Sequence, residues 1–354
     1  MPASRRGFLK AAGLALAAGV PAAAIEFRPE RSRAARSLLL REGAAREEMQ
    51  AAAEAERDNG DELRYANRIG NYSKGLPHND VGEVEPAAYR TLLQALTADA
   101  DEAGVERVRL GGNQKLVNPL AGIAYDLEGV DIQKLAAPPA PALASEERAR
   151  QMVELYWMAL CRDVPFTDFT TDAAAGAAAR ELGIPAGRLF RGFTAGDAYG
   201  PYVSQLFLTP FAYGQYLLDG RITTFAAGSD YLVQPNAWLA CQNGQGPFGA
   251  PQLDQEARYI RCGRDLAAYV HSDQACQAFY NAGLRLYALN APANPGNPYL
   301  RLRAQAPFAT FGPPHFLTLQ AEAALRAVKA FFTRSGSFTA HCVRRSLAVW
   351  SRRR

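Results

Sequence analysis

The sequence predicts a mainly α-helical protein, and three observations lead to this prediction. Several segments repeat apolar residues at the three- and four-residue spacing of an amphipathic helix. No segment of useful length alternates apolar and polar residues as a half-buried strand does. The composition, with 48% hydrophobic and 21% charged residues in a chain of 354, excludes a disordered, collagenous or coiled-coil protein.

The first residues have the pattern of an export signal. Arg5 and Arg6 precede an uncharged, alanine-rich run, residues 11–25, which is too short and too weakly apolar to span a bilayer stably. An amphipathic helix would need polar residues at helical spacing in this run, and there are none. We therefore expect a twin-arginine signal peptide over residues 1–25, cleaved after Ala22 or Ala24, and a bacterial protein that is periplasmic or secreted, with no stable membrane span afterwards.

Residues 26–332 are expected to form one helical region. Its helices are predicted over residues 31–57, from Pro86, from Ser145, over AAAGAAARELG to Gly183, over residues 264–290, and from near Pro314. The inward faces are predicted to be Tyr89, Leu92, Leu93 and Leu96; Met152, Leu155, Tyr156 and Ala159; Leu266, Tyr269, Val270, Tyr280, Leu284 and Tyr287; and Leu317, Ala321, Leu325, Val328 and Phe332.

Long irregular connections are expected between these helices. The linker over residues 135–144 contains three prolines, and residues 192–249 are rich in Gly, Pro and aromatic residues without sustained periodicity. We interpret them as irregular chain over a helical core.

The positive charge is confined to one end of the chain. The net charge is +4, but the last eleven residues, 344–354, contain five arginines and no acid. Because the remainder is close to neutral, the sequence indicates no broad basic face and argues against nucleic-acid binding.

The three histidines that precede residue 333 are expected to have structural roles. His78 lies in the turn-like peptide KGLPHND and is expected to form a loop hydrogen bond, while His271 is expected at the surface or satisfied in the core. His315 is expected to occupy a structural position at a helix start. None has an i+4 metal-binding partner, and nucleophile-elbow, Walker and Rossmann patterns are missing from the sequence.

The acidic residues and the cysteines likewise do not indicate a catalytic or metal-binding site. The pairs Asp58 with Asp61 and Glu83 with Glu85 are expected to be solvated in loops. The cysteines are Cys161, Cys241, Cys262, Cys276 and Cys342, and none has the spacing of a zinc site. In a continuous helix Cys262 and Cys276 would be roughly 21 Å apart, beyond the reach of a disulfide unless the helix breaks.

Four peptides, taken in order, carry a resemblance to a known family: residues 59–89, 154–169, 190–205 and 311–330. They resemble the vanadium-dependent haloperoxidases, specifically the bacterial relatives of the algal bromoperoxidases, in the acid phosphatase-like superfamily. The resemblance implies an all-α bundle, of which this chain is the N-terminal portion. It also implies peroxide-dependent halide oxidation, with halide and hydrogen peroxide as partners, and assembly into homo-oligomers.

In that family a lysine, two arginines, a Ser-Gly-His triplet and a histidine hold vanadate. The first vanadate-binding peptide, KWFVHRxLRPE, follows the helix that corresponds to residues 316–330. Here that place is taken by residues 332–354, in which Ser335 stands for the lysine and the region of Cys342 for the first arginine. Gly336, Ser337 and His341 do not match the triplet in order or neighbours. The sequence therefore assigns no catalytic, cofactor-binding or metal-binding residue, and we expect this chain to bind no vanadate.

A displaced reading frame would account for this difference. If the third base of each codon is joined to the first two of the next, synonymous codons for residues 332–349 permit HQKWFVHRALRPEEFGG. We therefore expect residues 333–354 to be an out-of-frame tail and the chain to be truncated before the vanadate site and inactive. The alternatives are a non-catalytic helical binding or oligomer-forming protein and a phosphatase-like relative.

Overall fold

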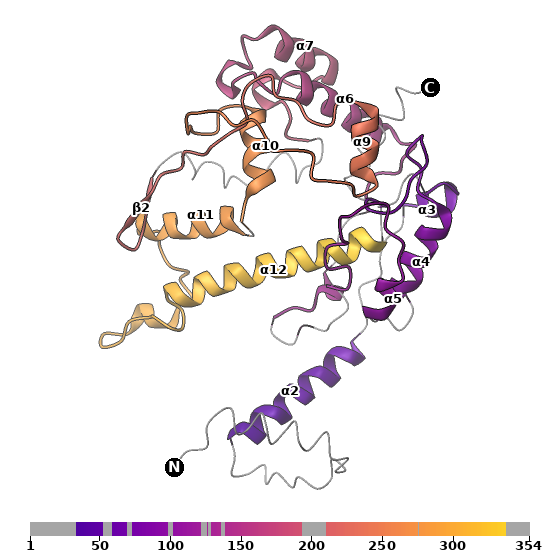
Figure 1. Ribbon diagram of the computed structural model, residues 1–354. Coiled ribbons are helices and arrows are strands. Elements are labelled where there is room, and N and C mark those ends of the chain that lie inside the picture. The colour runs from indigo at the N-terminus through magenta and orange to yellow at the C-terminus, as the bar shows by residue number, and fades with distance from the viewer. Residues whose placement is uncertain are drawn as a thin grey trace. The chain divides into compact units, whose positions relative to one another are not determined.

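The computed structural model describes residues 33–51, 59–68, 73–97, 102–121, 126, 129–135, 139–192, 210–274 and 276–337 (Figure 1). The chain divides into two compact units, one of Met1–Ala53 with Tyr125–Asp131 and the other of Glu54–Ala124 with Ile132–Arg354. The expected signal peptide, the third resembling peptide beyond Gly192 and the tail beyond Ser337 lie outside the described residues. The export and frame hypotheses remain predictions.

The first unit contains helix α2, Arg33–Gln50, which confirms the expected N-terminal helix. Its Ala, Leu, Glu and Arg residues are strong helix formers. Ala35 is buried, whereas Leu38, Leu39 and Leu40 are about half exposed or more. Helix propensity thus explains this element better than burial does.

In the second unit, the short helix α3, Asp61–Arg64, is followed by helices α4 (Pro86–Thr97) and α5 (Glu102–Glu106), which pack together. The predicted inward face of α4 is confirmed, since Tyr89 and Leu92 are buried and Leu93 and Leu96 are partly buried. The core here consists of Leu76, Val84, Ala88, Tyr89, Leu92, Ala95 and Val108.

A second core lies between helices α6 (Glu146–Leu160) and α7 (Ala173–Leu182), which are joined through η3 (Phe166–Asp168) and followed by η4 (Ala186–Arg188). Side chains cap both helices: the Ser145 hydroxyl accepts from the Arg148 amide at 3.1 Å, and the Asp172 carboxylate from the Ala175 amide at 2.8 Å. Gly183 ends α7 with a φ of 65°. The core consists of Cys161, Phe169, Ala175, Ala178, Leu182 and Leu189.

The predicted inward face of α6 is wrong. Ala159 is exposed and Met152, Leu155 and Tyr156 are only half-buried, whereas the polar residues Arg148, Gln151 and Glu154 are buried. The Arg148 guanidinium donates to the Gln151 amide oxygen at 3.0 Å and to the Pro141 carbonyl at 2.9 Å. Glu154 accepts from the Gly192 amide at 3.1 Å, so backbone groups of two different loops provide polar partners for this buried face.

The described part of the glycine-rich middle segment contains more regular structure than expected. Strands β1 (Phe211–Tyr213) and β2 (Tyr216–Leu218) form an antiparallel hairpin, with Gly214 at a φ of 60° in the turn. Helix α9, Pro235–Gln242, begins with a proline in its first turn. Strands of three residues are too short to give a recognisable alternation, which explains why the sequence did not indicate them.

The long helix predicted over residues 264–290 is in fact two helices, α10 (Gly263–Ser272) and α11 (Gln277–Ala288). The chain becomes extended at Asp273 and has a φ of 58° at Cys276, where an α-helix cannot continue. Although the helix breaks, Cys161, Cys241, Cys262 and Cys276 are all free thiols.

Helix α12, Pro313–Ser337, confirms the predicted last helix, and it packs against α11 and against η2, Ile132–Lys134 (Figure 1). The segment η6, Pro298–Arg301, precedes it. The predicted burial of these helices is wrong at several positions: Leu266 and Val270 on α10 are 41% and 63% exposed, and Leu325 on α12 is 56% exposed. The mainly helical fold class is confirmed, and no helix in the described ranges could cross a membrane.

Candidate functional site

A cluster of paired charged side chains lies where the loop after α6 meets the start of α10. The Phe166 amide donates to the Arg261 carbonyl at 2.8 Å, and the Arg264 amide to the Arg162 carbonyl at 2.8 Å. Gly263 lies against the Arg162 backbone, which a β-carbon there would meet at 3.4 Å. This close backbone approach brings charged side chains from residues 162–163 and 261–265 together.

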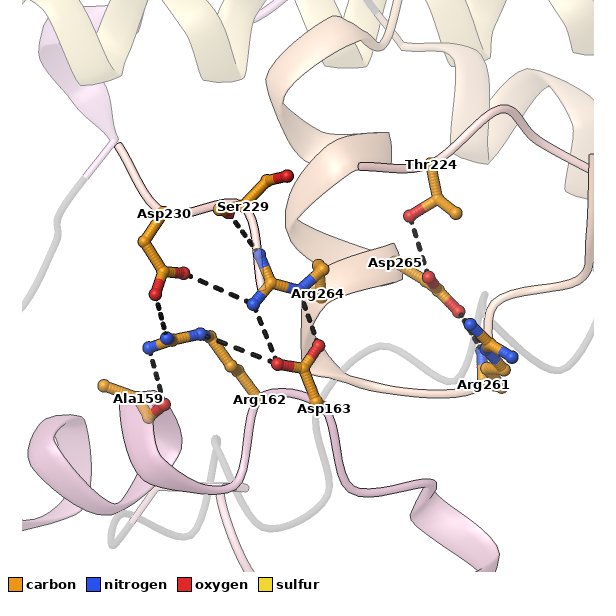
Figure 2. Close-up of polar contacts among 9 residues, drawn as sticks. All are labelled: Ala159, Arg162, Asp163, Thr224, Ser229, Asp230, Arg261, Arg264 and Asp265. Carbon is orange, nitrogen blue, oxygen red and sulfur yellow. Dashed lines mark hydrogen bonds and ion pairs between the residues drawn. The ribbon is translucent and has the colours of Figure 1, made fainter. Parts of the chain in front are cut away.

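Arg264 is the centre of the cluster (Figure 2). Its side chain is only 6% exposed, and its Nε and Nη2 atoms donate to the two Asp163 carboxylate oxygens at 2.5 and 2.8 Å. Nη1 donates to the Ser229 carbonyl, and Nη2 also reaches Asp230 Oδ1 at 3.3 Å. This bidentate pairing holds the pKa of Asp163 below its usual value, chiefly through the hydrogen bond from Arg264.

Arg162 and Asp230 close the cluster on the side of α6. Arg162 donates through Nη1 to the Ala159 carbonyl at 2.9 Å and through Nη2 to Asp230 Oδ2. Asp230 therefore bridges two guanidinium groups, and Arg162 Nε lies 3.9 Å from Asp163 Oδ2. The residues alternate in charge around the cluster, as Figure 2 shows.

Asp265 forms the neighbouring, more deeply buried contact. Its side chain is 1% exposed; Oδ1 accepts from the Thr224 hydroxyl at 2.7 Å, and Oδ2 accepts from the Arg261 amide and Nε, each at 3.2 Å. Two charged residues at the start of α10 thus fasten the loops around residues 224 and 229 to the helix.

This cluster does not fit an oxyanion such as vanadate. Arg162, Arg261 and Arg264 face Asp163, Asp230 and Asp265, so the positive and negative groups are equal in number. An oxyanion needs cationic or N–H groups that are not already bound to carboxylates. The other buried guanidinium in the described ranges, that of Arg148, donates to Gln151 and Pro141. We therefore assign the cluster a structural role, as a clamp between loops.

His78 makes the loop hydrogen bonds that the sequence predicted. Its Nδ1 lies 2.7 Å from the Leu76 carbonyl, and its Nε2 lies 3.1 Å from the Ser73 hydroxyl. Because a carbonyl can only accept, Nδ1 carries the proton and Nε2 accepts from Ser73. Burial lowers the pKa of the imidazole, and the Asn243 side chain accepts from the His78 amide at 2.7 Å.

The other two histidines also have the expected structural positions. His271 is exposed in the last turn of α10 and lies 6.1 Å from the Phe225 ring. The His315 Nδ1 accepts from the Phe311 amide at 3.0 Å in the first turn of α12. The described residues contain no group of three or more His, Cys, Asp or Glu side chains arranged to hold a metal.

The acidic residues expected in solvent are in part structural. Asp58 lies outside the described residues, but Asp61 is 1% exposed and accepts from the Leu143 amide at 2.7 Å, so its predicted solvation is wrong. Glu83 is half-buried and accepts from Asn67 at 2.8 Å, and Glu85 accepts from Arg109 at 2.8 Å. These carboxylates fasten loops to one another because backbone and amide donors are close to them in the fold.

Sequence reasoning missed the clamp entirely. Its members are separated by as many as 103 positions, and the adjacent charges Arg264 and Asp265 gave a local signal. Both residues lie on the same side of α10 as Ala268, which is buried. Charges on an inward helix face require partners, so this position could have indicated a buried polar network.

Comparisons with known proteins agree with this helical fold. The chain is 35% identical over 274 residues to a vanadium-dependent bromoperoxidase of Ascophyllum nodosum. The aligned region covers 70% of this chain and 49% of that protein. It is 29% identical over 360 residues to the vanadium-dependent bromoperoxidase of Corallina pilulifera, covering 77% of this chain and 60% of the relative. No protein-family model matches the chain.

A solved structure gives the same result. The homohexameric structure of the second vanadate-dependent bromoperoxidase from Ascophyllum nodosum matches with a TM-score of 0.73 and 29% identity, covering 85% of this chain and 53% of that one. The fold is thus that of the bromoperoxidase class of helical proteins. This chain is a homologue of the vanadium-dependent bromoperoxidases, within the haloperoxidase family, and it spans about half the length of the relatives it matches.

Proposed function

We propose that this chain is the amino-terminal part of an exported vanadium-dependent haloperoxidase and that, by itself, it neither binds vanadate nor oxidises halide. The observation that carries the proposal is the extent of the match, which reaches only 49% of the Ascophyllum relative. The peptide KWFVHRxLRPE, expected directly after residue 330 from the family resemblance, is not in the printed sequence.

The charge arrangement supports this proposal. In the intact family vanadate activates peroxide toward halide, and an anionic group of this kind needs uncompensated positive charge around it. The arginines of the clamp are neutralised by Asp163, Asp230 and Asp265. We propose that these residues hold the scaffold in shape. A phosphatase-like activity would require the same oxyanion-binding groups, so the same argument applies to it.

A bromination assay tests the proposal. Purified chain is mixed with orthovanadate, hydrogen peroxide, bromide and monochlorodimedone, and absorbance loss is followed. We expect no rate above that of orthovanadate alone, while the Ascophyllum bromoperoxidase serves as the positive control. Turnover that depends on this chain would contradict the proposal.

We also propose that the protein is bacterial and reaches the periplasm or the exterior by twin-arginine export. The support is the Arg5–Arg6 pair before the uncharged run over residues 11–25. Assembly into a homo-oligomer belongs to the same proposal, because one relative is described as homohexameric.

A further inference from the structure

The chain that leads into α12 presents apolar and cationic side chains together to solvent (Figure 1). Phe308 is 71% exposed and Phe311 is 53% exposed, while Leu300 and Leu302 are 56% and 46% exposed. Two arginines are exposed beside these leucines. We call the six residues Leu300, Arg301, Leu302, Arg303, Phe308 and Phe311 the arginine–phenylalanine loop.

Hydrogen bonds and a close backbone approach hold this loop in shape. Asn297, which is 9% exposed, donates through Nδ2 to the Phe311 carbonyl at 3.3 Å, and His315 Nδ1 accepts from the Phe311 amide at 3.0 Å. The backbone at Gly312 passes so close to that of Phe308 that a β-carbon on the glycine would meet it at 2.5 Å. The two phenylalanine side chains are therefore exposed on a loop that has defined contacts of its own.

The loop lies in a long stretch without acidic residues. The sequence contains no Asp or Glu from residue 274 to residue 321, and its charged residues there are Arg285, Arg301 and Arg303. Arg285 donates to the Pro210 carbonyl at 3.3 Å. Neither Arg301 nor Arg303 pairs with a carboxylate in the described part of the chain. Both guanidinium groups are thus free to bind a negatively charged partner.

This charge pattern distinguishes the loop from other exposed apolar side chains. Leu218 and Leu253 are also exposed, but each is followed directly by an aspartate, Asp219 and Asp254 respectively. A carboxylate beside an apolar side chain opposes contact with an anionic surface. Those positions therefore lack the combination of apolar and purely cationic groups that the loop has.

A bilayer that contains anionic lipid offers both kinds of contact that the loop can make. Exposed apolar side chains enter the boundary between headgroups and acyl chains, and arginines are attracted to anionic headgroups. Nucleic acid would provide the negative charge without an apolar phase. We infer that the arginine–phenylalanine loop is a peripheral membrane-binding site for anionic phospholipid, with Phe308 and Phe311 as the inserting residues. This inference goes beyond the proposed function and needs no vanadate site.

Vesicle co-sedimentation tests the inference. The full chain is mixed with vesicles of phosphatidylcholine alone, or of phosphatidylcholine and phosphatidylglycerol in equal parts. We expect sedimentation with the second kind and little with the first, and we expect added salt to weaken it. Arg301→Gln with Arg303→Gln should weaken binding by about tenfold or more, since each arginine near an anionic surface strengthens binding by about fivefold.

A matched control removes the same charge elsewhere. Arg90 on α4 and Arg107 after α5 are also exposed, so Arg90→Gln with Arg107→Gln gives the same net charge and should bind as the original chain does. The arginine-rich residues 344–354 and the expected signal peptide also attract anionic lipid, but both double variants leave them unchanged. Thermal unfolding at the original temperature establishes that both variants fold.

Tryptophan fluorescence locates the contact. Phe308→Trp should give blue-shifted emission with anionic vesicles and be quenched by brominated lipid, after the signal of the original chain is subtracted. Phe248 is 48% exposed outside the loop, so Phe248→Trp should show neither effect. Phe308→Ser should weaken vesicle binding several-fold, because apolar area that enters the bilayer is lost.

Five results would overturn the inference: no sedimentation with anionic vesicles, equal sedimentation with both kinds of vesicle, equal losses in the two arginine double variants, an unchanged Phe308→Trp spectrum, or self-association without lipid that Phe308→Ser abolishes. The last result would assign the loop to a second copy of this chain. Bromination by the lone chain would contradict the proposed function and leave this inference intact.

Discussion

Arg264 and Asp265 are adjacent charged residues that serve two different loops. Arg264 binds Asp163 and the segment at residues 229–230, while Asp265 binds Thr224 and Arg261. A buried guanidinium or carboxylate is stable only when its hydrogen-bonding capacity is largely used, so both side chains hold their loops in one arrangement. The charges of Arg264 and Asp265 therefore have a structural role.

The pairing of Asp163 predicts an acid-dependent stability. Its pKa is lowered in the folded state, so its contribution is fully present above about pH 4, the ordinary unfolded value, and is lost as the pH falls through the folded pKa. Asp163→Asn should therefore lower the free energy of unfolding, measured by urea denaturation at pH 7, by about 1 kcal/mol after allowing for solvent screening of this half-exposed carboxylate. The difference from the original chain should shrink at pH 3.

Asp273→Asn provides the control for this comparison. Asp273 is exposed at the end of α10, where its carboxylate is in solvent. We expect the same urea midpoint as the original chain at both pH values. An Asp163→Asn effect that stayed constant between pH 7 and pH 3 would rule out the charge pairing as its cause.

Helix ends and breaks decide how the elements are joined. The αL residue Gly183 ends α7 and turns the chain toward η4, while Cys276 separates α10 from α11 at a φ of 58°. The first follows a rule that the sequence shows, because glycine adopts this conformation without strain. The second does not, because cysteine has no such preference and the surrounding contacts must hold it there.

Gly183→Ala tests the first of these ends. No atom lies within 4 Å of the position that a β-carbon would occupy, so only the backbone conformation opposes alanine. We expect a loss of about 1 kcal/mol in the free energy of unfolding, measured by urea denaturation. Gly187→Ala, in η4, has equally open space without the positive φ and should change stability little. Equal effects at the two positions would contradict this account.

At the scale of the whole molecule, the chain has the fold of one part of the bromoperoxidases, which are longer proteins. It matches 85% of its own length to the solved bromoperoxidase, with a TM-score of 0.73, and yet covers 53% of that chain.

Export is testable by changing the two arginines. Arg5→Lys with Arg6→Lys should hold the precursor in the cytoplasm of a host with twin-arginine export, because that route reads the arginine pair as its address. Cell fractionation with immunoblotting measures the distribution. The original signal serves as the control, and periplasmic protein at unchanged abundance from the double variant would contradict the export proposal.

The sequence by itself determined the helical class, the starts of α4, α6 and α12 and the end of α7, because periodicity, Pro86, Ser145 and Gly183 act locally. The tertiary structure alone decided which helix faces are covered. It buried Arg148 and Glu154 on α6 and left Leu325 exposed on α12, against the apolar pattern of both helices. It also assembled the clamp from Asp163, Asp230 and Arg264. Burial and charge pairing depend on what another part of the chain places opposite a residue, and helical spacing carries no information about that partner.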